Sequence, residues 1–170
     1  MKWERYWEKV LYYLGAFGEV RLCTEKASKM ERAVKIMPNA ALKPEDKKLL
    51  TFEMRILKKL DHPNIIKIYE IFEEKAHIFI VTEYCKGGDL FDRIEKLKKL
   101  SEEETRIIIK QLASALYYCH SNHIVHRDIK PENILMQSSE VSDLRIKLID
   151  FGTAVEYNCL LYTSPSPRDS

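Results

Sequence analysis

The chain lacks long apolar runs: none of its 170 residues form a stretch near the roughly 18 that a membrane-spanning helix needs. Its start, Met1 to Arg5, also lacks the apolar stretch of a signal peptide. The net charge of +2 gives no positive excess for a nucleic-acid surface. The four cysteines contain no Cys-x-x-Cys pair, so we expect reduced thiols and no disulfide framework. These absences predict a cytoplasmic protein, with nuclear access left open, and no membrane or nucleic-acid partner.

The composition is that of an ordinary globular protein, with 45% hydrophobic and 32% charged residues. A chain of this length can form one domain with a substantial core, or two small lobes that share one. No internal repeat is visible.

The pattern of elements changes along the chain, from mostly strand to mostly helix. The first half has one helical period, from Lys47 to Leu60, in which Leu49, Phe52, Ile56, Leu57 and Leu60 are apolar. The segments expected to form strands there are Glu19 to Thr24, Arg32 to Met37, Ile65 to Phe72 and Ile78 to Tyr84.

A long helix is expected after Ser101, which forms a capping-box pattern with Glu104. The apolar stripe of this helix contains Ile108, Leu112, Ala115, Leu116 and Cys119. Two short strands should follow, at Ile134 to Met136 and Arg145 to Ile149. This order of elements predicts an α+β fold with two unequal lobes.

Two short strings carry the chemistry: His126-Arg127-Asp128-Ile129-Lys130-Pro131-Glu132-Asn133, and Asp150-Phe151-Gly152. Asp128 can accept a proton, and Lys130 can neutralise charge on a transferred phosphoryl group. The amide of Asn133 and the carboxylate of Asp150 suit a hard, oxygen-seeking cation such as Mg²⁺. We interpret His126 as a core histidine that bonds to backbone. Both strings resemble signatures of protein kinases.

Two charges stand on apolar patterns upstream. Lys35 lies inside the strand Ala33 to Ile36, and Glu53 lies on the inward stripe of its helix, between Leu49 and Ile56. Burying a lone carboxylate costs several kcal/mol, so a cation should accompany it. The two residues are therefore expected to form the lysine–glutamate pair with which kinases orient the nucleotide phosphates. The alternative is that both lie at an edge with their charged groups in water.

A glycine-containing segment precedes these charges, from Tyr13 to Val20. It resembles the phosphate-covering loop of kinases, but Tyr13 stands where the first glycine is expected. Gly15 and Gly18 still permit close backbone approach. Whether Tyr13 reflects divergence or an assembly error stays open.

The chain from Tyr6 to about Asn158 thus resembles the protein kinase superfamily. The run Lys130 to Asn133 is similar to serine/threonine kinases, and Leu60 to Ile65, Gly87 to Phe91 and Tyr118 to His120 resemble the calcium-dependent protein kinases. The resemblance implies a bilobal fold, with residues 1–84 as the β-rich N-lobe and 85–158 as the start of a helical C-lobe. It implies Mg²⁺ and ATP, with Thr82 as gatekeeper. The residues implied to bind the nucleotide are Gly15, Ala16, Phe17, Gly18, Val20, Ala33, Lys35, Thr82, Glu83, Cys85, Asp89, Asn133, Leu135 and Asp150.

The resemblance also bears on partners. It implies protein substrates with serine or threonine, and Asp89 and Glu132 match positions that meet basic side chains upstream of the target residue. Both could equally be solvated caps or loop acids. Arg127 is expected to pair with a phosphate or acid on the activation loop. No Asp-x-Asp-x-Asp-Gly loop is present, so calcium or calmodulin control follows from resemblance only.

Two alternatives to a kinase are compatible with parts of the sequence. A kinase-like protein that binds nucleotide or a partner without turnover would fit the altered glycine segment. A zinc site would use the cluster of four residues Cys119, His120, His123 and His126.

The last residues differ from the rest of the chain. Cys159 to Asp169 closely resembles the translated read-through of a sequencing adapter, so 159–170 is expected to be non-structural. A natural tail is the alternative. On the first interpretation the fragment lacks the activation loop and should be inactive, and the helix after Ser101 should expose Leu112 and Leu116.

Overall fold

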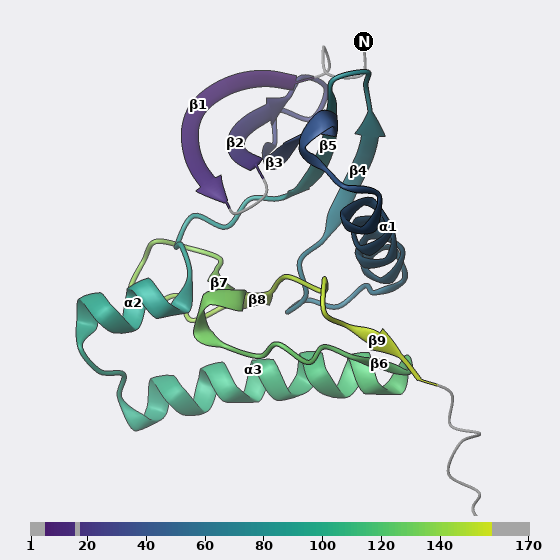
Figure 1. Ribbon diagram of the computed structural model, residues 1–170. Helices are drawn as coiled ribbons and strands as arrows, with labels where there is room; N and C mark the ends of the chain where they lie inside the picture. The colour runs from purple at the N-terminus through teal and green to yellow at the C-terminus, as the bar shows by residue number, and fades with distance from the viewer. Residues whose placement is uncertain (1–5, 16–17, 158–170) are drawn as a thin grey trace, which may run out of the picture.

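The computed structural model describes residues 6–15 and 18–157, in which a five-stranded sheet lies above a mainly helical part (Figure 1). The strands of the sheet are β1 Tyr6–Gly15, β2 Gly18–Glu25, β3 Glu31–Pro38, β4 Ile68–Glu73 and β5 His77–Glu83. Their spatial order is β1-β2-β3-β5-β4, and all pairs are antiparallel. The α+β prediction is confirmed.

The alternation along β3 places its side chains on two faces of the sheet. Val34 and Ile36 are buried in a cluster with side chains of β2, β4 and β5. Because successive side chains of a strand point to opposite faces, Ala33 and Lys35 lie on the other side of the sheet. This explains how a central strand carries a lysine.

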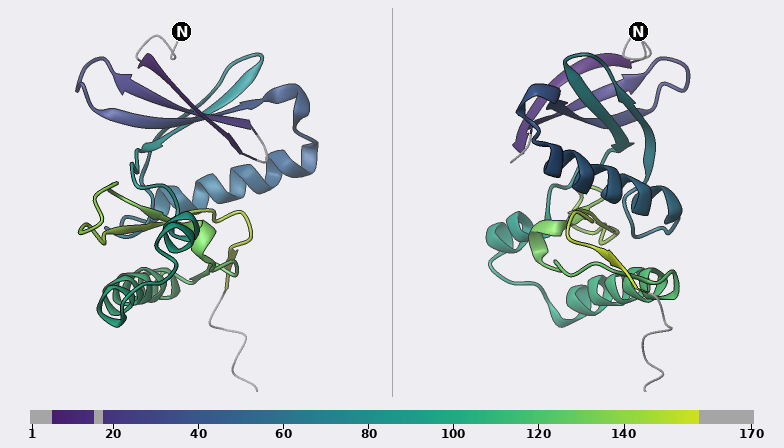
Figure 2. Two further views of the ribbon diagram at one scale, coloured as in Figure 1. Left: turned by 90° about the vertical axis from the view of Figure 1, so that its left-hand side faces the viewer. Right: turned by 45° about the vertical axis from the view of Figure 1, so that its right-hand side comes forward.

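Helix α1, Pro44–Lys59, lies between the sheet and the elements below it in both views of Figure 2. Ile56 and Leu57 are buried as expected, and Leu60 follows the helix in the core. The assignment of Leu49 to the inward stripe was wrong, because its side chain is 56% exposed. Leu50 packs against the core instead, so the helix is rotated by one residue from the expected phase at its first turns.

The lower part contains α2, Leu90–Leu97, and α3, Glu102–Ser121. The capping box of α3 is confirmed: Ser101 Oγ accepts from Glu104 N at 3.2 Å, and Glu104 Oε2 accepts from Ser101 N at 2.8 Å. The predicted exposure of Leu112 and Leu116 was wrong, since Leu112 is buried and Leu116 packs against the core. The exposed apolar side chains of α3 are Ile109 and Tyr117, on its other face.

Short elements connect these helices. They are η2 Asn39–Ala41, β6 Ile124–Val125, η3 Pro131–Asn133, β7 Ile134–Met136, β8 Ile146–Leu148 and β9 Val155–Glu156. Strand β6 pairs with β9, and β7 pairs with β8.

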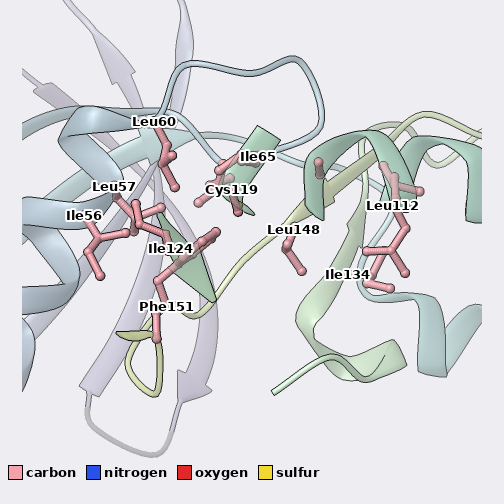
Figure 3. Close-up of a cluster of buried hydrophobic side chains, with 14 of the residues drawn as sticks. Ile56, Leu57, Leu60, Ile65, Leu112, Cys119, Ile124, Ile134, Leu148 and Phe151 are labelled. Atoms are coloured by element: carbon pink, nitrogen blue, oxygen red, sulfur yellow. The ribbon is translucent and has the colours of Figure 1, made fainter. Parts of the chain in front are cut away.

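One core joins the upper and lower parts. The cluster in Figure 3 takes Ile56 and Leu57 from α1, Leu112 from α3, Leu148 from β8, and Phe151 from the segment that follows. The segment carrying Asp150 is thus anchored between the two helices.

Three of the four cysteines and the helices α1 to α3 lie within residues 6–15 and 18–157. Cys23 and Cys119 are buried and Cys85 is half-buried, while Cys159 lies outside the described residues. Among the described residues, no helix is long and apolar enough to span a membrane.

Candidate active site

Asp128 is held by two residues of the same string. Lys130 Nζ lies 2.7 Å from Asp128 Oδ2, and Asn133 Nδ2 donates to the same oxygen at 2.9 Å. Asn133 Nδ2 also bonds to the Asp128 carbonyl at 2.9 Å, because η3 turns the chain back over Asp128. The hydrogen bond from Lys130 is the largest of the influences that lower the pKa of Asp128, so its carboxylate is ionised at neutral pH.

His126 is a structural residue, as expected. Its Nε2 bonds to the Ile149 carbonyl at 3.0 Å and its Nδ1 accepts from Asp128 N at 3.3 Å, which fits a neutral ring protonated at Nε2. Burial is the main cause that lowers the pKa of His126. The ring also meets Phe151 edge to face, with centroids 4.6 Å apart. His126 therefore ties the string around Asp128 to the strand that leads to Asp150.

The backbone is left-handed at two residues of the site, Arg127 with φ 68° and Asp150 with φ 62°. Arg127 Nε donates to the Thr153 carbonyl at 2.7 Å, and Thr153 Oγ1 donates to the His126 carbonyl at 3.0 Å. Arg127 thus binds the segment after Gly152, while its predicted phosphate or acidic partner stays a prediction.

The two expected Mg²⁺ ligands present oxygen atoms only. Asn133 uses its Nδ2 atom for Asp128, which leaves its Oδ1 atom available to a cation. Asp150 is exposed, and its Oδ1 accepts only a 3.2 Å bond from Gly152 N among the described hydrogen bonds. One amide and one carboxylate fit Mg²⁺, which keeps waters and binds substrate phosphates as its other ligands.

Glu53 lies beside this segment, but its expected direct ion pair with Lys35 is not formed. Among the described residues, the ion pairs within 4.0 Å do not include these two. Burial raises the pKa of Glu53, while the charge of Lys35 and the Phe151 N–H lower it and Asp150 raises it. The carboxylate of Glu53 is therefore near both Lys35 and the segment that carries Asp150 and Phe151.

The sheet brings several of the nucleotide residues side by side. Val20 on β2 is paired with Lys35 on β3, and Ala33 is paired with Thr82 on β5. Thr82 Oγ1 donates to the Glu83 carbonyl at 3.1 Å. Gly15 pairs with Gly18 at the hairpin of β1 and β2. The remaining loop residues, Ala16 and Phe17, lie outside the described residues.

The chain after β5 carries four further expected residues. Cys85 is half-buried, and burial raises the pKa of its thiol to about 12. The backbone of Asp89 forms an isolated antiparallel β-bridge with Leu135 of β7. The side chain of Asp89 caps α2, because its Oδ1 accepts from Asp92 N at 2.8 Å. The cap interpretation of Asp89 therefore describes this structure, whereas Glu132 is exposed.

Sequence reasoning missed two residues of this region. Gly87 packs so closely that an added Cβ would lie 2.3 Å from the Ser138 carbonyl oxygen. Lys147 of β8 is buried and pairs with Glu83 at 2.8 Å. The adjacent glycines Gly87 and Gly88 were a signal for the first residue. A lysine flanked by Ile146 and Leu148 gave only a weak signal for the second.

The zinc alternative fails on geometry. No group of three His, Cys, Asp or Glu side chains able to hold a metal occurs within 6–15 and 18–157. His126 is engaged with Ile149, while His123 packs edge to face against Tyr157. The adapter interpretation of 159–170 falls outside the described residues and stays a prediction.

Comparison with known proteins decides the family. The model of the protein kinase domain matches residues 14–164, which is most of the chain. This chain belongs to the protein kinase family. The strings around Asp128 and Asp150, expected to act in catalysis and metal binding, lie inside the matched region. We call residues 83–89 the hinge segment.

Named kinases are similar over most of the chain. Calcium-dependent protein kinase 4 of Plasmodium berghei (strain Anka) is 42% identical over 84% of the chain, and calcium-dependent protein kinase 5 of Plasmodium falciparum (isolate 3D7) is 44% identical over 82%. Serine/threonine-protein kinase SIK2 of Gallus gallus is 42% identical over 81%. The matched regions span 27%, 24% and 17% of these three proteins.

Proposed function

We propose that the protein is a serine/threonine kinase that transfers the γ-phosphoryl group of ATP to a protein hydroxyl. The observation that carries the proposal is the contact of Asp128 Oδ2 with both Lys130 and Asn133. An ionised carboxylate held in this way can accept the proton of the incoming hydroxyl. Lys130 stands within 2.7 Å of that carboxylate, where its charge would also stabilise the transferred group.

Asn133 and Asp150 would hold Mg²⁺, and Lys35 would meet the nucleotide phosphates. Bound magnesium would neutralise charge on those phosphates. Val20, Ala33 and Thr82 lie on neighbouring strands and would cover the adenine, whose edge would meet the backbone of Glu83 and Cys85. Similarity to calcium-dependent kinases supports calcium control in the complete protein, and we keep it as a proposal.

A preference for basic residues upstream of the target is the finer part of the proposal. Glu132 supports it, because it is exposed and belongs to the same string as Asp128. Asp89 supports it less, because one of its oxygens already caps α2. A peptide array phosphorylated by the full-length protein should show arginine or lysine before the target, and an array without that preference refutes this part.

Asp128→Asn in the full-length protein tests the reaction. Turnover should fall by about 10²–10⁴-fold, because a general base is lost. Affinity for Mg²⁺–ATP, measured by titration, should be unchanged. Equal turnover in the variant and the parent would refute the role of Asp128. Binding of ATP without turnover in the parent would favour the non-catalytic alternative.

A further inference from the structure

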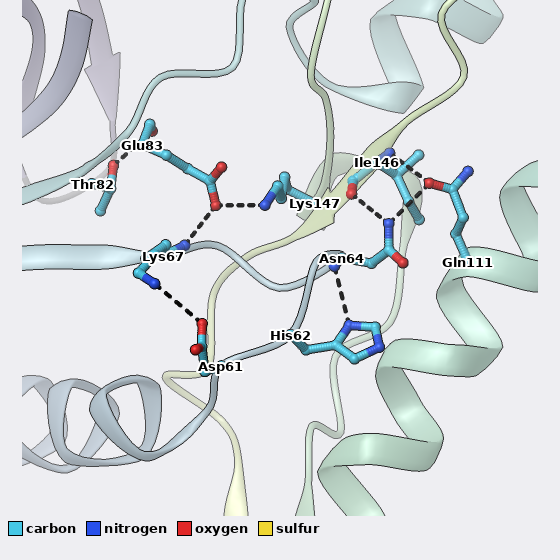
Figure 4. A network of polar contacts seen from close by, with 9 residues as sticks. All are labelled: Asp61, His62, Asn64, Lys67, Thr82, Glu83, Gln111, Ile146 and Lys147. Carbon is cyan, nitrogen blue, oxygen red and sulfur yellow. Dashed lines mark hydrogen bonds and ion pairs between the residues drawn. The ribbon is translucent and has the colours of Figure 1, made fainter. Parts of the chain in front are cut away.

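Lys147 is the one buried lysine or arginine side chain in the part of the chain that the structure describes, with 8% of its surface exposed. Its Nζ lies 2.8 Å from Glu83 Oε1, and the two side chains are 10% and 14% exposed. Figure 4 shows the pair between the hinge and β8. A buried ion pair is often replaceable by apolar residues without loss of stability, so fold stability alone does not account for it.

The Glu83 carboxylate is held from a second side. Lys67 N donates to Glu83 Oε1 at 2.7 Å, and Glu83 N donates to the Lys67 carbonyl at 3.0 Å. The residues before Lys67 are themselves bonded to β8: Ile66 N donates to the Leu148 carbonyl at 3.0 Å, and Leu148 N donates to the Asn64 carbonyl at 2.8 Å. Both donors to Glu83 are therefore anchored on β8.

This anchoring connects the two ends of the nucleotide site. Strand β8 ends at Leu148, two residues before Asp150, the proposed metal ligand. Glu83 begins the hinge, and its carbonyl oxygen already accepts from Thr82 Oγ1. The pair thus fixes the hinge backbone relative to the strand that carries the metal site.

We propose that Lys147 is a positioning residue for adenine recognition. Through Glu83 it holds the hinge carbonyl where the 6-amino group of adenine can donate to it. The inference rests on the proposed function, because it concerns the same ATP site. On this proposal Lys147 does not touch the nucleotide, yet it determines how strongly ATP is preferred over a nucleotide without the 6-amino group.

Lys67 offers a matched control. Its side chain lines the same cavity of about 330 Å³ as Lys147 and Glu83. Its Nζ pairs with Asp61 at 3.3 Å, but these side chains are 54% and 82% exposed. Lys67→Met therefore removes one positive charge from the same cavity and leaves the backbone N–H of residue 67 on Glu83.

The experiment compares Mg²⁺–ATP with Mg²⁺–purine riboside triphosphate, which lacks the 6-amino group. The ratio of their dissociation constants is insensitive to the fraction of folded protein, because both ligands bind the same folded molecules. The parent should prefer ATP by about fivefold to tenfold, which is the contribution of one neutral hydrogen bond. Lys147→Met should bring the ratio to about one. Lys147→Arg should restore most of the preference, and Lys67→Met should keep it.

The outcomes separate the role of Lys147 from the proposed kinase function. An unchanged ratio in Lys147→Met, with normal ATP binding by the parent, overturns the role of Lys147 alone. A parent that binds neither nucleotide overturns the proposed function and this inference with it. If Lys147→Met does not fold, Glu83→Gln serves instead: it keeps the shape of the side chain and removes its charge. The preference for ATP should fall in Glu83→Gln, and an unchanged ratio of the two dissociation constants in that variant overturns the inference.

Discussion

Phe151 provides a direct test of the core that joins the two parts of the molecule. Its side chain is fully buried, and its ring meets His126 at a centroid distance of 4.6 Å and an interplanar angle of 67°. Phe91 on α2 is a matched control of the same residue type, because 47% of its surface is exposed. We expect Phe151→Ala to destabilise the fold much more than Phe91→Ala.

The magnitudes follow from burial. Truncating a fully buried phenylalanine to alanine costs about 3–5 kcal/mol, because transfer and cavity terms add. The edge-to-face contact with His126 contributes about 0.5–1.5 kcal/mol to that loss. Phe91 is half exposed and leaves no closed cavity, so its truncation should cost about 1 kcal/mol. The expected difference between the variants is about 3 kcal/mol.

Urea unfolding of both variants measures this difference. With a slope of about 2 kcal/mol per molar urea, the midpoint should fall by about 2 M for Phe151→Ala and about 0.5 M for Phe91→Ala. Equal midpoints in the two variants would show that Phe151 does not join the parts through a shared core. Equal midpoints would then mean that the neighbouring side chains collapse around the missing ring and leave no cavity.

Two further predictions concern His126 and Gly87. Because burial lowers the pKa of His126, the unfolded chain takes up a proton below about pH 6.5 that the folded chain does not. The free energy of unfolding should therefore fall as pH drops from about 7.5 to 5.5, by at most about 1.4 kcal/mol per unit for this group, and the fall should be smaller in His126→Asn. Urea titrations at several pH values check the sign, and an equal slope in the variant contradicts it. Gly87→Ala should destabilise by about 1–3 kcal/mol through overpacking against Ser138 and Met136. Gly88→Asn should cost less, because nothing lies within 4 Å of the added Cβ and asparagine tolerates the φ of 71° better than other residues with a side chain. Thermal melts of the two glycine variants measure the difference, and equal melting temperatures would refute the packing argument for Gly87.

Local patterns predicted the elements well where the pattern is long or the chemistry specific. The capping box at Ser101, the stripe of α3 and the limits of β7 were found correctly from sequence. The strings around Asp128 and Asp150 were also sufficient to indicate the family. The order of these residue types along the chain is a local property, so it can be seen before folding.

The errors concern properties that depend on packing. Whether Leu49 or Leu50 faces the core depends on how α1 is rotated on the sheet. The charge of Lys35 lowers the pKa of Glu53, but whether the two groups form a direct ion pair depends on the same placement. Helix α2 was missed, although the cap residue Asp89 and the spacing of Leu90, Ile94 and Leu97 were signals for it. The pairing of Lys147 with Glu83 joins positions 64 residues apart, so no local pattern could reveal it.

The left-handed backbone at Arg127 and Asp150 has a consequence for the natural variation that this fold tolerates. A residue with a Cβ held there costs about 1–2 kcal/mol, less for aspartate, and glycine would remove most of that strain. Selection for stability alone would therefore favour glycine at both positions. The two side chains would then be kept only by selection for the roles that we propose for them. The strain makes the two positions a record of function, and a paralogue that had lost catalysis should lose these residues early.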